Sequence, residues 1–358
     1  MTVFTGLLLF VILYIFSFYA DYLKIDKRRQ WLVFLYLIIV FCIGSRNTGG
    51  WIDTVTYVES FNYNTNTLSS FSFSDTPLGY TEKGYYLLCV IAKTIFNNPQ
   101  IYLFFIGALS MAFLFPSLDK YTPMPFLGLS IYIARFMLGR DMNQMRAGLA
   151  ISVIMFATMY AVKRKYIKYI LFIITAYFIH TSALIALPIL LLDRLNIKKK
   201  HIIIGLVLAF IIAGFFGGTV KSIISNWDFV QELARTYVEE GSEKAWANNL
   251  ANPLIYFQIM CLLIYTFKEK QLAKQFVYYY TIRNAYFYST ILLIVLCQYG
   301  IVAGRTSTVF ATYEISIIPM IITTYKKGAK ILPYIFIFGL MVFFFLKNWP
   351  GSPIGFLD

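Results

Sequence analysis

Charge is scarce in this sequence, and its scarcity excludes a soluble globular protein. Only 13% of the 358 residues are charged, whereas 59% are hydrophobic and 19% are aromatic. A soluble domain carries about a quarter charged residues and about half apolar ones. Apolar runs of the roughly 17 to 25 residues that cross a bilayer recur along the chain. The composition therefore predicts an all-α, polytopic integral membrane protein with about 10–12 hydrophobic helices.

Motifs for nucleotide, metal and redox chemistry are also missing. The chain has no Walker motif, no glycine-rich dinucleotide loop, no nucleophile elbow and no metal-ligand cluster at standard spacing. Its four cysteines all lie within apolar runs without metal or redox spacing, which indicates buried hydrophobic residues and no disulfide framework. We therefore expect a protein that uses no metal or other cofactor and hydrolyses no ATP.

The positive charge that the chain does carry is placed between the apolar runs. The net charge is +14, and basic clusters occur at residues 24–29, 163–168, 194–200, 268–274 and 326–330. Short loops rich in lysine and arginine stay on the cytoplasmic side of a membrane. The charge therefore marks topology, and it does not indicate a nucleic-acid partner.

These clusters orient the predicted helices within one transmembrane domain that covers residues 1–358. The first apolar run has neither a preceding basic region nor a small-residue cleavage site, which indicates a retained helix. The polar segments 45–82 and 218–252 then form outer loops that contribute to an outward-facing cavity, and the second should contain an interfacial helix. The expected spans are 3–20, 31–45, 101–118, 125–139, 147–162, 202–217, 253–267, 277–300, 306–325 and 331–346.

Two apolar segments do not fit simple spans. Segment 83–97 is short and joins two positions that both face outward, so we expect a re-entrant or interfacial helix, unless a basic cluster faces outward. Segment 167–192 has basic residues on both flanks and His180 near its middle. It forms either one long span or a hairpin of two half-helices with His180 near the tip; the charge rule favours the hairpin.

Four arginines are expected at the outer ends of helices, where they do not signal topology. These residues are Arg46, Arg140, Arg146 and Arg305. Arginine recognises phosphate through a planar, bidentate fork and keeps its charge when partly buried. The set predicts a shared site for a diphosphate on an anionic, lipid-linked substrate. The alternative is that each guanidinium separately reaches the membrane interface.

Other polar residues lie near these arginines in the sequence. Asp53 follows a Gly-Gly turn after Arg46, and it either accepts a proton from a hydroxyl nucleophile or forms a structural pair with arginine. Tyr57, one helical turn later, either positions a sugar or belongs to an aromatic belt. Gln144 opens a helix rich in small residues, which should be central. His180 could bind phosphate, shuttle a proton or cap a half-helix.

Together these motifs resemble those of EpsG-type proteins. The segment RNTGGWIDTVTYVESF (residues 46–61) resembles their R-x-x-x-G-x-x-D-x-x-x-Y-x-x-x-F pattern. NQMRAGLA (143–150) and FIHTSALI (178–185) resemble their glutamine–arginine motif and their F-x-H-x-S-A-L element. Arg305 with Tyr313 and Pro319 resembles the late arginine–tyrosine–proline region, so the resemblance extends over most of the chain.

The resemblance implies a polysaccharide polymerase of the Wzy kind, acting in capsule, exopolysaccharide or O-antigen assembly. Such a membrane glycosyltransferase joins oligosaccharide units carried on undecaprenyl diphosphate, both donor and acceptor, on the outer side of the bacterial plasma membrane. A protein that regulates chain length is a further expected partner. Two alternatives stay open: a flippase for lipid-linked oligosaccharide, and an O-antigen ligase or another transferase that uses a lipid donor.

Within this scheme the residues receive separate roles. Asp53 is the expected base, with His180 as the alternative, and Arg146 completes the catalytic set. A base must accept the proton of the attacking hydroxyl, and arginines can stabilise a departing diphosphate without a metal. The residues expected to bind diphosphate or sugar are Arg46, Arg140, Gln144, Arg305, Tyr57 and Tyr313.

Overall fold

The computed structural model describes residues 3–75, 81–225, 250–298 and 300–350, and these segments are helices, turns and loops without a strand. The predicted all-α class is therefore confirmed. Within these described segments, five helices are long and apolar enough to cross a membrane, or six if one bent pair counts as a single span, so the protein is a multi-pass membrane protein. The chain divides into two compact units, Met1–Leu187 with Ile318–Phe356, and Pro188–Ile317. The single domain expected over the whole chain stays a prediction.

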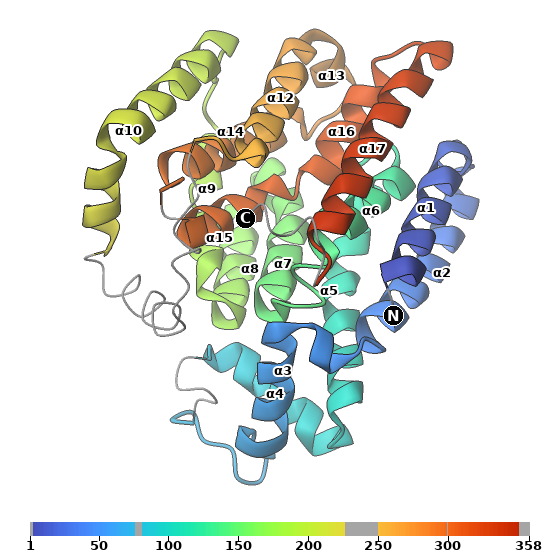
Figure 1. The fold of residues 1–358 in the computed structure, drawn as a ribbon, viewed down its shortest axis with the longest axis vertical. Helices are drawn as coiled ribbons and strands as arrows, with labels where there is room; N and C mark the ends of the chain where they lie inside the picture. Colours follow the sequence, from blue (N-terminus) through green and yellow to red (C-terminus); the bar gives the residue numbers. More distant parts are fainter. Residues whose placement is uncertain (1–2, 76–80, 226–249, 299, 351–358) are drawn as a thin grey trace. The chain divides into compact units, whose positions relative to one another are not determined.

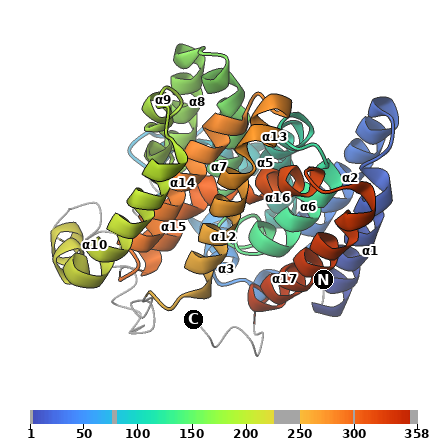
Figure 2. The same cartoon turned by 90° about the horizontal axis from the view of Figure 1, so that it is seen from above.

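The first unit is built around α5 and α7. Helix α5 packs against α2 and α7, α7 packs against α8, and α1 packs against α6 and α17 (Figures 1 and 2). Small residues at the start of α7 allow this close approach, and Ser152 lies 3.1 Å from Ser110 of α5, oxygen to oxygen. The central position predicted for α7 is confirmed. The helices of the first unit are α1 (Val3–Ala20), α2 (Ile25–Gly44), α3 (Ile52–Glu59), α4 (Lys83–Phe96), α5 (Pro99–Tyr121), α6 (Pro125–Tyr132), α7 (Met145–Val162), α8 (Tyr166–Ile179) and α17 (Ile331–Lys347).

Residues 166–186 turn back on themselves at His180, in agreement with the hairpin that the charge rule favoured for segment 167–192. Helix α8 ends at Ile179, His180 is extended, and a 3-10 helix, η5 (Thr181–Ala186), follows. The hydroxyl of Tyr169, near the start of α8, donates to the carbonyl oxygen of Ala186 at 2.8 Å. The chain therefore turns back at His180 and returns along α8.

Helix α4 is a single short helix of 14 residues. At 1.5 Å per residue it is about 21 Å long, which is less than the roughly 30 Å of a hydrocarbon core. It packs on α5 and α8, and a Cβ at Gly84 would lie 2.7 Å from the carbonyl oxygen of Phe178. The glycine therefore lets the start of α4 reach the turn at His180. The re-entrant or interfacial placement stays a prediction.

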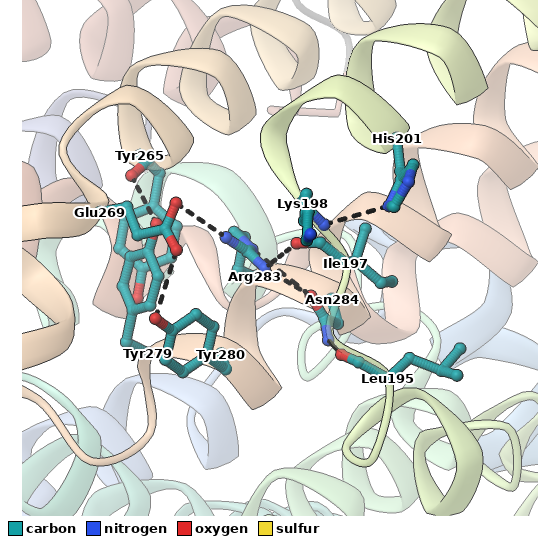
Figure 3. Close-up of polar contacts among 10 residues, drawn as sticks. All are labelled: Leu195, Ile197, Lys198, His201, Tyr265, Glu269, Tyr279, Tyr280, Arg283 and Asn284. Carbon is teal, nitrogen blue, oxygen red and sulfur yellow. Dashed lines mark hydrogen bonds and ion pairs between the residues drawn. The ribbon is translucent and has the colours of Figure 1, made fainter.

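The second unit is organised around α14. This helix packs against α9, α10, α12 and α15. Figure 3 shows Arg283, fully buried on α14, between the loop before α10 and the start of α13: it donates to the carbonyl oxygen of Ile197 at 2.5 Å and lies 3.6 Å from the Glu269 carboxylate. One guanidinium thus connects this loop and α13 to α14. The helices of the second unit are α9 (Ile189–Leu192), α10 (Lys199–Ser225), α12 (Pro253–Phe267), α13 (Glu269–Gln275), α14 (Tyr279–Val295) and α15 (Gly300–Ala311). The boundary between the units falls within α16 (Glu314–Thr323).

Two expected spans were placed wrongly in this part of the chain. The helix expected to end at the glycine pair 217–218 continues to Ser225, since a glycine costs a helix only about 1 kcal/mol. The span expected at 306–325 is two helices, α15 and α16, bent by 45°, and Arg305 lies within α15 and not before it. The interfacial helix expected within 219–252 falls largely on 226–249, outside the described residues.

Candidate functional site

A charged cluster joins the start of α7 to α3, α4 and η5. Nη1 of Arg146 lies 2.6 Å from Oε2 of Glu82, and Nε of Arg146 donates to the hydroxyl of Tyr57 at 3.2 Å. Oε1 of Glu82 accepts the backbone N–H of Thr181 at 3.0 Å. The Arg146 and Glu82 side chains are 13% and 11% exposed, so the pair is largely shielded from solvent. We call Asp53, Tyr57, Glu82 and Arg146 the Arg146 cluster.

Helix α3 is held against the link before α7 by two hydrogen bonds. The backbone N–H of Asp53 donates to Oδ1 of Asn143 at 3.0 Å, and the hydroxyl of Thr54 donates to the carbonyl oxygen of Met142 at 2.7 Å. Asp53 therefore stands at the first turn of α3, and Tyr57 stands one turn further along the same helix. The spacing of four residues places the carboxylate and the phenol on one face of α3, and the phenol of that face contacts Arg146.

The pKa of the Tyr57 hydroxyl depends on the charges of this cluster. Burial raises this pKa, the nearby Arg146 guanidinium lowers it, and the Asp53 and Glu82 carboxylates raise it again. Both carboxylates therefore lie close enough to act on the phenol. The cluster contains one guanidinium and two carboxylates, an arrangement suited to accepting a proton and to holding hydroxyl groups.

Arg46 lies in a second, deeper group. Its side chain is 1% exposed, and it donates to the carbonyl oxygen of Ile43 at 2.5 Å, to the Thr54 hydroxyl at 3.3 Å and to the Met145 sulfur at 2.7 Å. Burial lowers the pKa of this guanidinium to about 10, so it stays charged at neutral pH. Arg46 thus joins the end of α2 to α3 and to the start of α7.

Arg140 and Asp141 belong to the same deeper group. Arg140 is 5% exposed, and its guanidinium carbon lies 4.3 Å from the centre of the Phe136 ring. Asp141 is 3% exposed and accepts hydrogen bonds of 2.5 Å from the hydroxyls of Ser110 and Tyr132. Burial raises the pKa of Asp141, whereas these hydrogen bonds and the charges of Arg140 and Arg46 lower it. The pKa of Asp141 therefore stays above its usual value, although the carboxyl lies beside two guanidinium groups.

His180 caps the 3-10 helix η5 with its ring. Its Nδ1 accepts the backbone N–H of Ser182 at 3.2 Å and lies 2.7 Å from the Ser182 hydroxyl. A nitrogen that accepts an N–H carries no proton, so in the neutral ring the proton is assigned to Nε2. His180 is half-buried, and the next residue, Thr181, donates to Glu82. The ring and the Arg146 cluster are thus attached to one turn.

The structure brings together some of the residues predicted from the sequence. Asp53, Tyr57 and Arg146 form one cluster beside the His180 turn, while Arg46 and Arg140 form the deeper group. Gln144 precedes α7, and its carbonyl oxygen accepts the N–H of Gly148 at 3.0 Å, without a side-chain cap. Arg305 and Tyr313 lie in the second unit, where Tyr313 is buried and stacks on Phe310. The convergence of all four arginines stays a prediction.

Three charged residues were missed by sequence reasoning: Glu82 and Asp141 of these groups, and Arg135, which lies over the same Phe136 ring as Arg140. Glu82 was given no role, although a carboxylate directly before a short apolar segment was a signal that could have identified it. Asp141 was hidden between Arg140 and Arg146 in a link that seemed merely polar. Arg135 sits inside an apolar run, where an ionisable residue is a candidate for function by default.

The fold and these clusters define a multi-pass helical membrane protein with a buried carboxylate–guanidinium site. The chain belongs to the EpsG family, whose model matches residues 29–357, nearly its whole length. This membership supports a role of the polysaccharide-polymerase type. Comparisons with curated proteins and with solved structures found no match.

The Arg146–Glu82 pair should be strongly coupled in a double-mutant cycle of Arg146→Gln and Glu82→Gln. Removing one partner of a buried ion pair costs about 3–5 kcal/mol of unfolding free energy, because the other charge is left uncompensated. The cycle, measured by reversible unfolding in mixed micelles, should give a coupling of about 2 kcal/mol or more.

The matched control for this cycle is the Arg29–Asp119 pair, at 3.4 Å, in which the arginine is 66% exposed. Exposed pairs are worth about 0–1 kcal/mol, because solvent screens them. Equal coupling energies for the two pairs would contradict the buried contact.

Proposed function

We propose that this protein polymerises oligosaccharide repeat units carried on undecaprenyl diphosphate, on the outer side of the bacterial plasma membrane. The observation that carries the proposal is the Arg146 cluster, a buried constellation of acid, phenol and guanidinium groups in a member of the EpsG family. Ionisable groups are expensive at membrane depth, so a cluster of this kind is a functional site by default.

The reaction we propose is a glycosyl transfer. A sugar hydroxyl of one lipid-linked unit attacks the anomeric carbon of the growing chain. The new C–O bond forms as the bond to the diphosphate breaks, and undecaprenyl diphosphate leaves with the electron pair. The hydroxyl proton passes to a base. The energy for polymerisation comes from the sugar–diphosphate bond, which is consistent with a chain that carries no nucleotide-binding motif.

We assign Asp53 as the base. Glu82 is engaged by Arg146 and by the amide of Thr181, which makes it a positioning residue for both. Asp53 stands on the same face of α3 as Tyr57, so an acceptor sugar held by the Tyr57 hydroxyl would present its own hydroxyl to the carboxylate. A base must lie within hydrogen-bond reach of the proton it removes.

His180 receives a different role from the base that the sequence also allowed. With Nδ1 accepting from Ser182, its Nε2 presents an N–H and not a lone pair. Such a donor suits an oxygen that gains negative charge in the transition state, as the leaving oxygen of a diphosphate does. We therefore propose His180 as a hydrogen-bond donor to the donor substrate.

Purified protein should extend a defined undecaprenyl-diphosphate-linked repeat unit in vitro, and Asp53→Asn and Arg146→Ala should each lower kcat by about 10²–10⁴-fold. The products are read by gel and mass spectrometry, with Arg29→Ala, an exposed arginine, as the matched control. Extension should persist in EDTA, as the metal-free scheme requires. Transfer of finished chains to another acceptor, or movement of lipid without new bonds, would contradict polymerisation.

Two substitutions of His180 distinguish its role as a helix cap, through Nδ1, from its role as a hydrogen-bond donor, through Nε2. In His180→Asn the amide oxygen can still accept from Ser182, but no N–H reaches the Nε2 position, so activity should fall about 10²-fold with little loss of stability. In His180→Gln a side-chain N–H can reach that position while the cap is weakened, so activity should survive better and stability should fall by about 1 kcal/mol. The reverse order of activities would show that activity depends on the cap and not on a donated N–H, whereas equal and complete loss in both variants would show that the ring acts as a base, because neither amide can accept the proton.

A further inference from the structure

The end of α6 departs from regular helix at an arginine. Residues Ile133–Met137 form a π-helix, η4, which contains Arg135. The side-chain amide of Asn348 donates to the carbonyl oxygens of Ala134 and Arg135, at 3.2 and 3.4 Å, and so holds the widened turn. Single π-helical turns are rare and occur frequently at functional sites. The irregular turn thus fixes the position of a charged residue within an apolar segment.

Two guanidinium groups share one aromatic ring at this turn. The guanidinium carbons of Arg135 and Arg140 lie 5.0 and 4.3 Å from the centre of the Phe136 ring. The two carbons are therefore within about 10 Å of each other, a distance that one diphosphate can bridge. Arg135 also lies 4.8 Å from the centre of the Phe344 ring of α17. Phenyl faces hold both cations and fix the direction in which their N–H groups point.

The two arginines differ in how far they are buried. Arg140 is 5% exposed, whereas Arg135 is half-buried, so a group that enters from outside meets Arg135 before Arg140. Phe343, the neighbour of Phe344 on α17, is an exposed large apolar side chain. A phosphate attached to a hydrocarbon chain could therefore bind Arg135 while its chain contacts the apolar surface of α17.

This pair lies close to the Arg146 cluster along the chain and in space. A Cβ at Gly148 would lie 3.3 Å from the Cβ of Arg140, and Arg146 stands two residues earlier on the same helix. The link that carries Arg140 also accepts the N–H of Asp53 at its end, through Asn143. The Arg146 cluster, with two carboxylates and one guanidinium, and the Arg135–Arg140 pair, with Asp141 beside it, therefore lie near each other in one unit.

We propose that Arg135 and Arg140, held by Phe136, bind the diphosphate of the lipid-linked sugar. This inference rests on the proposed function. The Arg135–Arg140 pair binds the phosphates of the donor, and the Arg146 cluster binds and deprotonates the attacking hydroxyl. Arg135, the more exposed residue of the pair, binds the phosphate nearer the surface, and Arg140 binds oxygens of the phosphate that lies deeper. Lipid phosphate and free diphosphate share this chemistry, so the test must tell them apart.

Binding of undecaprenyl diphosphate without sugar, to protein in nanodiscs, tests the proposal without any turnover. Arg135→Gln and Arg140→Gln should each raise the Kd for this probe about tenfold or more, through loss of a charge-assisted contact. Arg135→Lys, which keeps the charge, should fall between Gln and wild type. The Kd for undecaprenol should not change, and free inorganic diphosphate should bind much more weakly. Asp53→Asn and the exposed control Arg29→Gln should leave the Kd of undecaprenyl diphosphate as in wild type.

The outcomes separate this inference from the proposed function. A Kd independent of Arg135 in a protein that still polymerises would overturn the diphosphate site alone. An equal dependence on Arg135 for phosphatidylglycerol would show a general headgroup contact, and would also overturn it. Binding that depends on Arg135 in a protein that makes no polymer would support the site and contradict the polymerase.

Discussion

The buried ion pair between Arg146 and Glu82 is the interaction on which the rest of the site depends. Each charge would be costly to bury alone, and at 2.6 Å each charge offsets the cost of burying the other. Glu82 carries the constraint onward to the Thr181 amide, and Arg146 carries it to Tyr57. One pair therefore fixes α3, α4, α7 and the turn at His180 in a single arrangement, within which Asp53 is placed.

A division of charge gives the unit its chemical character. The Arg146 cluster holds two carboxylates with one guanidinium, while Arg135 and Arg140 share the ring of Phe136 nearby. Transfer of a sugar from a diphosphate needs both kinds of place, because a hydroxyl must lose a proton while an oxygen leaves with negative charge. The short polar link between η4 and α7 contains Arg140, and its Asn143 accepts the N–H of Asp53, so this link holds the two groups at a fixed separation.

The sequence predicted the membrane class and most helices because apolar length is a strong signal; α12, for example, coincides with the expected 253–267. It misjudged α10 and the 306–325 span because glycines do not always end a helix, and because a bend leaves the composition unchanged. Asp53 and Tyr57 were singled out by their spacing and Arg146 by its expected place at the outer end of a helix, and the structure brings the three residues near one another. The role of Glu82 depends on a partner 64 residues away, and such pairing is set by packing, which local pattern does not encode.

The most direct test of this account is a cryo-EM structure of the Asp53→Asn variant with an undecaprenyl-diphosphate-linked repeat unit bound. The account predicts sugar hydroxyls within hydrogen-bond reach of residue 53 and Tyr57, and phosphate oxygens on the guanidinium groups of Arg135 and Arg140. A substrate seated elsewhere, with the Arg146–Glu82 pair undisturbed and remote from every sugar, would contradict it.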